Sequence, residues 1–198
     1  MADYETLISL RPIEREDLTF LRDLASDATV RSQVVGWGWP TSLVNQERWF
    51  EAQLRDTDTQ RFIVCDAVGE PLGVAGLWGI DWHNSTAEVG LKLGPGQQVR
   101  GKGYGFRALT AVTEFGFWDV GLHRLWAGML STNEASYRLF TVKAGWREEG
   151  RLREHVWRDG AYCDLIQVGL LRSEYVSPTG RTIVAPARNI PADDAGEC

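Results

Sequence analysis

Three glycines at alternate positions, Gly101, Gly103 and Gly105, stand between an apolar run typical of a strand and a run typical of a helix. Glycine leaves the backbone N–H groups unshielded, and the helix that follows directs the positive end of its dipole to the same place. A pyrophosphate is the ligand that suits such a turn best. The sequence therefore predicts a strand, an anion-binding turn and a helix in succession.

Two familiar phosphate loops do not fit this turn. A P-loop would need Ser or Thr after Gly96, Gly101 and Lys102 to hold magnesium, and the residue there is Gly103. The dinucleotide fingerprint would need a third glycine where Phe106 stands, and no Asp or Glu follows in the right place. A glycine-rich turn that only begins a helix remains the alternative.

Apolar periodicity and turn residues predict an alternation of strands and helices along most of the chain. Seven strands are predicted, at residues 7–11, 62–66, 72–80, 87–93, 125–130, 146–155 and 162–171. Four helices are predicted, at 14–25, after an N-cap at Asn45, at 106–120 and at 135–143. Asp159-Gly160 supplies the turn of the last hairpin. This order predicts a single α/β domain over residues 6–175 with a mixed, strongly bent sheet, and a flexible tail at 176–198.

Composition limits the partners of the chain. A net charge of −6 argues against general nucleic-acid binding and fits a basic substrate such as an amine. No apolar run approaches the roughly 20 residues of a membrane span, and residues 1–5 lack the apolar core of a signal peptide. Cys65, Cys163 and Cys198 are few and scattered, which is typical of a reduced cytoplasmic protein and not of a disulfide scaffold or a zinc site.

The pattern Arg100-x-x-Gly103-x-Gly105 resembles the acetyl-CoA-binding signature of the GNAT superfamily of N-acetyltransferases. The resemblance extends over about residues 6–175 and is closest to the branch that acetylates ribosomal-protein N-termini and related small amines. Further runs match in order and spacing, at residues 121–125, 133–136, 143–150, 151–154 and 159–164. Each run alone is weak, and their order and spacing together carry the resemblance.

The resemblance implies a GNAT fold of about seven strands with about four helices on both faces of the sheet. In that fold the strands at 87–93 and 125–130 splay apart at one end, and the pantetheine arm of acetyl-CoA pairs with the first of them. It implies a set of cofactor-binding residues in and around the gap: Leu91, Leu93, Arg100, Gly101, Lys102, Gly103, Tyr104, Gly105, Phe106, Asn133 and Ser136. No metal is expected.

Acetyl transfer to an amine needs a proton acceptor, a polarised carbonyl and a stabilised leaving thiolate. Glu88 is the candidate base, with solvent exposure or an ion pair to a neighbouring basic residue as the alternative. The N–H near Leu93 can polarise the carbonyl oxygen. Ser136 matches the family as the donor to the thiolate, because Phe140 stands where many relatives have a Tyr acid. One extra residue near 141–142 predicts a bulge in that helix.

The acceptor is less defined by the sequence. Trp37, Trp39, Trp82 and His83 fall in segments expected to rim the acceptor mouth, either as an aromatic box for a cation or as ordinary packing residues. The favoured reaction is direct transfer of acetyl to a protein or peptide N-terminal α-amine. The alternatives are a small amine such as a polyamine, amino sugar or antibiotic, or a non-catalytic acyl-CoA sensor. The expected partner is the amine substrate, with no nucleic acid and no membrane, and a homodimer is left open.

Overall fold

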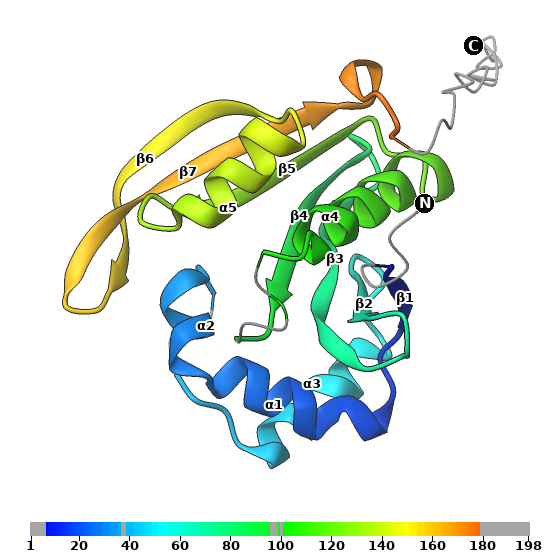
Figure 1. Cartoon of the computed structure of the whole chain (residues 1–198), viewed down its shortest axis with the longest axis vertical. Coiled ribbons are helices and arrows are strands. Elements are labelled where there is room, and N and C mark those ends of the chain that lie inside the picture. Colours follow the sequence, from blue (N-terminus) through cyan, green and yellow to red (C-terminus); the bar gives the residue numbers. More distant parts are fainter. Residues whose placement is uncertain (1–6, 37–38, 96–98, 100, 179–198) are drawn as a thin grey trace, which may run out of the picture.

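The computed structural model describes residues 7–36, 39–95, 99 and 101–178, which form one mixed sheet covered by helices (Figure 1). The sheet has seven strands in the order β1-β2-β3-β4-β5-β7-β6. The strands are β1 Ser9–Pro12, β2 Gln60–Cys65, β3 Pro71–Asp81, β4 Thr86–Leu93, β5 Arg124–Leu130, β6 Arg147–Arg158 and β7 Ala161–Leu171. All neighbouring pairs are antiparallel except β4 and β5, which are parallel. The predicted α/β fold class is confirmed.

Five α-helices lie on the two faces of this sheet, among the described residues. They are α1 Leu18–Ser26, α2 Ala28–Gln33, α3 Leu43–Gln53, α4 Tyr104–Glu114 and α5 Glu134–Arg138. One apolar cluster joins α1 to Ile63 and Val74 of the sheet. The larger cluster joins α4 and Phe140 to the opposite face, through residues such as Leu77 and Leu125. The helices therefore form one layer on each side, as the family resemblance implies.

The sheet opens at its centre, between the two parallel strands. β4 and β5 pair only at Thr86–Arg124, Ala87–Leu125 and Glu88–Trp126. Beyond Glu88, β4 continues to pair with β3 up to Leu93, while β5 continues to pair with β7 up to Leu130. The predicted splay is confirmed, and within the described part of the chain it leaves one edge of the second half of β4 without a strand partner.

Some local predictions need correction. The helix α2 was not predicted, because its six residues carry too few apolar positions to show a period. The N-cap of α3 is Ser42, whose hydroxyl accepts from the N–H of Asn45, so Asn45 lies inside the helix and not at its cap. The predicted bulge is present as a π-helical turn at Leu139–Lys143. A second π-helical turn, Phe115–Asp119, ends the helix predicted at 106–120.

The N-terminal strand is fixed to α1 by an ion pair, which gives a first testable expectation. Arg11 Nη1 and Nη2 each donate to Asp17 at 2.7 Å, and the N–H of Glu14 donates to the same carboxylate at 2.8 Å. Burial would raise the pKa of Asp17, but the hydrogen bonds from Arg11 and Glu14 outweigh it and the pKa is lowered. Asp17→Asn should cost about 1–3 kcal/mol in the free energy of unfolding at pH 7.

This loss should depend on pH in one direction. A lowered pKa in the folded state means that the stabilisation is complete above the unfolded carboxyl pKa, near 4, and is lost as the pH falls through the folded value. Thermal unfolding of both proteins from pH 7 to pH 2 should therefore show a difference that shrinks in acid. Asp23→Asn is the matched control, because the Arg22–Asp23 pair is exposed. Equal losses in the two variants would contradict the assignment.

Candidate active site

The strand β4 separates two environments by the alternation of its side chains. Leu91 and Leu93 point to the first turn of α4, where their side-chain carbons come within 3.9 Å of the Cβ position of Gly105. Glu88 and Lys92 belong to the opposite face, on the side of α1 and α3. One face of β4 therefore borders α4, and the other carries the charged residues Glu88 and Lys92.

The glycine turn leads into α4 with the geometry that the sequence predicts. Gly103 is the N-cap of α4 and has φ 83° and ψ 0°, in the left-handed region that favours glycine. Apart from its two chain neighbours, no described residue has an atom within 4 Å of a Cβ built at this position. The first N–H groups of α4 can hydrogen-bond an anion there. Arg100 lies outside the described residues.

A cavity of about 670 Å³ extends from this turn along the end of β4 to α2 and to the start of α5. Most of the predicted cofactor residues line it: Leu91, Leu93, Gly101, Gly103, Gly105, Phe106, Asn133 and Ser136. Lys102 and Tyr104 do not, because Lys102 is exposed and the Tyr104 side chain is 5% exposed within the core. Burial limits the predicted contact of Tyr104 with the cofactor to its backbone, whereas the exposed Lys102 side chain stays a predicted contact.

A cofactor with a pyrophosphate and a peptide-like arm fits the residues present. The turn offers N–H donors at a helix start, and the unpaired edge of β4 offers backbone groups that such an arm can satisfy.

The described residues contain no cluster of three or more His, Cys, Asp or Glu side chains that could hold a metal ion. They also contain no helix with both the length and the apolar character needed to cross a bilayer.

Asn133 and Ser136 begin α5 on the far side of the cavity. Asn133 Oδ1 accepts from the N–H of Ser136 at 3.0 Å, which confirms the predicted N-cap. Its Nδ2 donates to the carbonyl of Gln33 at 2.9 Å, so the amide also holds the end of α2. Arg158 Nη2 adds to this attachment by donating to the carbonyls of Val34 and Val35, at 2.8 and 3.0 Å.

Phe140 gives the cavity an apolar end. It is 4% exposed and packs against Trp146 with ring centroids 5.0 Å apart. Ser136, the predicted proton donor, lines the cavity together with Phe140. Its hydroxyl role remains a prediction.

Glu88 stands at the point where the sheet divides. It is the last residue of β4 that pairs with β5, and it lies opposite Trp78 of β3. Burial raises the pKa of its carboxyl, and the charge of Lys92 lowers it in part. A partly buried carboxyl with a raised pKa is suited to accept a proton near neutral pH, so this position agrees with the predicted role.

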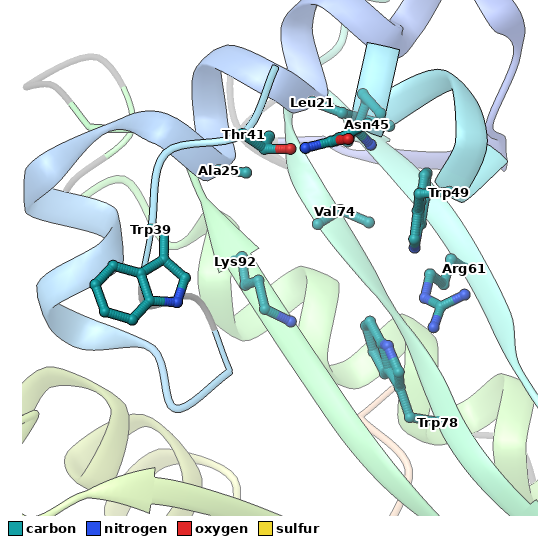
Figure 2. Close-up of a pocket in the computed structure, with 11 residues that line it drawn as sticks. Leu21, Ala25, Trp39, Thr41, Asn45, Trp49, Arg61, Val74, Trp78 and Lys92 are labelled. Carbon is teal, nitrogen blue, oxygen red and sulfur yellow. The ribbon is translucent and has the colours of Figure 1, made fainter. Parts of the chain in front are cut away.

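A second cavity of about 300 Å³ lies on this charged face, between α1, α3 and the sheet (Figure 2). Trp39, Trp49 and Trp78 line it together with Arg61 and Lys92. The Arg61 guanidinium carbon is 5.4 Å from the Trp49 ring centroid and 5.3 Å from that of Trp78. Lys92 Nζ is 4.5 Å from the Trp78 ring centroid. Because Lys92 also lines the larger cavity, the two cavities meet at this residue.

This cavity corrects the predicted aromatic box. Trp39 lines it, and Trp37 lies outside the described residues. Trp82 and His83 lie in the turn between β3 and β4, at the opposite end of β4 from Lys92, and they line neither cavity. Trp82 instead donates to Asp58 at 3.1 Å. The turn that carries Trp82 and His83 precedes Glu88 by a few residues, but β4 leads away from this turn toward the glycine turn at the start of α4.

The residues that sequence reasoning missed are Trp49, Arg61, Trp78 and Lys92. They come from three strands and a helix, and no spacing in the sequence connects them. Lys92 and Glu88 share a face of β4 by period-two alternation, which could have been noticed. Gly90, between them, indicates that a side chain packs closely on this face of β4, because a Cβ there would lie 2.5 Å from the Trp78 ring. Only a glycine lets that ring cover the strand.

Three comparisons with known proteins agree with this geometry. The acetyltransferase (GNAT) domain family matches residues 8–147. An SPbeta prophage-derived uncharacterized N-acetyltransferase of Bacillus subtilis is 30% identical over 168 residues, which cover 85% of this chain and 92% of that protein. The spermidine N(1)-acetyltransferase of Escherichia coli K12 is 27% identical over 183 residues, which cover 90% of this chain and 95% of that protein. A crystal structure of the spermidine N-acetyltransferase of Vibrio cholerae with CoA and spermine superposes with a TM-score of 0.78 at 25% identity, over 85% of this chain and 97% of that one.

Proposed function

Because the chain belongs to the GNAT family of acetyltransferases and is an N-acetyltransferase that uses acetyl-CoA, we propose that its acceptor is the primary amine of a small molecule. The names of the relatives support this proposal, since two of the three describe acetylation of spermidine. They favour the small-amine alternative over the protein N-terminus that the sequence pattern favoured. Polyamines are accordingly the first acceptors to test, and the link to the ribosomal-protein branch stays a prediction.

The observation that carries the proposal is that the two cavities meet at Lys92, on the same strand as Glu88. The larger cavity fits the cofactor and the smaller cavity lies on the side of α1 and α3; Glu88 lines neither of them but shares a face of β4 with Lys92. Two reactants can therefore approach the same point from the two sides of one strand. This arrangement supports direct transfer in a ternary complex, because both ligands can be bound at once.

The chain's own residues would act as follows. The N–H groups at the start of α4 hold the pyrophosphate, and the open edge of β4 hydrogen-bonds the pantetheine arm. Bound acetyl-CoA supplies an activated acetyl thioester. Glu88 accepts the proton of the incoming ammonium, directly or through water, and an N–H of β4 near Leu93 hydrogen-bonds the thioester oxygen. Ser136 donates to the departing sulfur.

An acceptor panel tests this function. Release of CoA thiol should be followed with spermidine, spermine, an amino sugar and a peptide with a free α-amine, each with acetyl-CoA. We expect turnover with at least one small amine and little with the peptide. Turnover restricted to the peptide would support the protein N-terminus instead. Tight acetyl-CoA binding without transfer to any amine would support a sensor.

Replacing Ser136 by Ala should lower kcat by roughly ten- to a hundredfold, because one hydrogen bond to a developing charge is lost. The affinity for acetyl-CoA should change little, since the N-cap at Asn133 uses the backbone N–H of Ser136 and not its hydroxyl. Steady-state kinetics and calorimetry with CoA measure the two effects. Ser136→Thr is the matched control, because it keeps a hydroxyl. Full activity of Ser136→Ala would mean that solvent protonates the thiolate.

A further inference from the structure

The smaller cavity is lined by positive charge and not by negative charge. Among the eleven described residues that line it, Arg61 and Lys92 are charged and none carries a carboxylate. Thr41, Asn45 and Gln46 add neutral polar groups. A polycation in this cavity would meet like charges at short range, which costs free energy in a partly buried site.

The aromatic rings of the cavity already have cations next to them. Arg61 lies between the rings of Trp49 and Trp78, and Lys92 lies over Trp78 (Figure 2). Cation–π attraction from these two rings is thus used within the chain, and less of it remains for a cationic ligand. The same contacts hold the guanidinium and the ammonium in fixed positions beside the cavity.

Arg61 retains capacity to bind an anion. Its side chain is 14% exposed, and its Nη1 is buried and makes no hydrogen bond with any described residue. The carboxylate near it is that of Asp56, with Oδ2 at 3.8 Å from Nη1, which is too long for a hydrogen bond. Burial lowers the pKa of Arg61, with Asp56 raising it in part. A buried guanidinium N–H of this kind is satisfied best by a carboxylate or phosphate oxygen.

Lys92 interacts electrostatically with Glu88, the proposed base. Burial lowers the pKa of Lys92 to about 8, Glu88 raises it and Arg61 lowers it. The ring that Lys92 covers belongs to Trp78, which pairs directly with Glu88 across β3 and β4. The ammonium therefore leans back along β4 toward Glu88. An anion at Lys92 and an amine at Glu88 can belong to one small molecule.

We propose that the smaller cavity binds an acceptor that carries a carboxylate or phosphate within a few bonds of its amine, with Arg61 and Lys92 as the groups that bind the anion. An amino acid with an aromatic or apolar side chain is the class that fits best, because Trp39, Trp49 and Val74 line the rest of the cavity. This inference rests on the proposed function and narrows its substrate. It also sets the chain apart from its spermidine-acetylating relatives.

Matched ligand pairs test the proposal. Phenylalanine and 2-phenylethylamine differ by the carboxylate, and phosphoethanolamine and ethanolamine differ by the phosphate. In the wild-type protein kcat/KM should be at least roughly tenfold higher for the anionic member of one pair than for its partner or for spermidine, as expected for a charge-assisted hydrogen bond. The pair that shows the preference identifies the anion. Spermidine or a neutral-tailed amine as the better acceptor would overturn the proposal.

Variants show whether the preference comes from these two residues. Arg61→Gln should reduce the ratio of kcat/KM between the anionic acceptor and its neutral partner to near one. Lys92→Met should have the same effect on this ratio if Arg61→Gln does not fold. Arg55→Gln is the control, because Arg55 is exposed and lines neither cavity. An unchanged ratio in both variants would reject the assignment.

A binding measurement separates this proposal from the proposed function. Tryptophan fluorescence should be titrated with phenylalanine and 2-phenylethylamine in the presence of CoA, since three Trp side chains line the cavity. Preferential binding of phenylalanine without acetylation of any amine would support the anion site and reject the small-amine reaction. Acetylation of amines without any preference for the anion would support the reaction and reject the anion site.

Discussion

Gly103→Asp should weaken the binding of acetyl-CoA by roughly 30- to 1,000-fold. A carboxylate at the start of α4 would lie next to the pyrophosphate, where like charges about 4 Å apart repel by about 4 kcal/mol at an effective dielectric constant of 20, and by less where water has access. Gly103 stands at the N-cap of α4 with space for a side chain around it. The expected loss is therefore electrostatic. Isothermal titration calorimetry with acetyl-CoA measures it.

The control for this variant is Gly103→Asn. Asn has nearly the size of Asp and adopts left-handed backbone readily, so it makes the same demand at φ 83° without the charge. Binding should be close to that of the wild type in Gly103→Asn, and raising the salt concentration should recover part of the affinity in Gly103→Asp. Equal affinities in the two variants at low salt would show that the pyrophosphate does not bind at this turn.

Glu88→Gln should lower kcat/KM at pH 7 by roughly 10²- to 10⁴-fold, which is the range typical of a general base. In the wild type, kcat/KM should rise with pH as the Glu88 carboxyl ionises, at a pKa raised by burial. In the variant the rate should instead follow ionisation of the acceptor amine, near pH 10 for a simple alkylamine. Activity should therefore recover at high pH. A pH profile identical in shape and height for the two proteins would remove Glu88 from the mechanism.

Stability distinguishes this role from a purely structural one. The fold raises the pKa of Glu88, so the carboxylate form is less favourable in the folded chain than in the unfolded chain. The free energy of unfolding therefore falls as the pH rises from the unfolded pKa through the raised folded pKa. Glu88→Gln should thus be no less stable than the wild type at pH 7. Glu88→Asp keeps a carboxylate and should retain part of the rate. A variant that unfolds more easily but keeps its rate would indicate that Glu88 only pairs with Lys92.

Local signals in the sequence were sufficient for the elements around the cofactor cavity. The alternate glycines placed the start of α4 to within two residues, at Phe106 where the helix begins at Tyr104, and the apolar run before them placed β4. The extra residue in the helix after Asn133 appeared as the π-helical turn at Leu139–Lys143. In each case the determinant lies within a few residues of the structure it specifies.

The acceptor side depends on contacts that no local pattern records. Arg61 and Lys92 come together because β2, β3 and β4 are neighbours in the sheet and because Trp78 lies between the two charges. Trp82 was assigned to this side because its segment was expected to rim the acceptor mouth. Its position shows that distance along a hairpin does not say which end of the strand faces the ligand.

The attachment of α2 to the C-terminal half of the chain has a consequence for the order of folding. Asn133 and Arg158 hold the end of α2 through hydrogen bonds that connect residues 100, 124 and 123 positions apart. Contacts of such separation close large loops, and they form late when the chain is synthesised from its N-terminus. The helix α1 and the strands β2 and β3 can collapse earlier around their own apolar cluster. The rim of the cofactor cavity is then completed late in folding, because β6, which carries Arg158, pairs with β7 and both strands must have emerged from the ribosome.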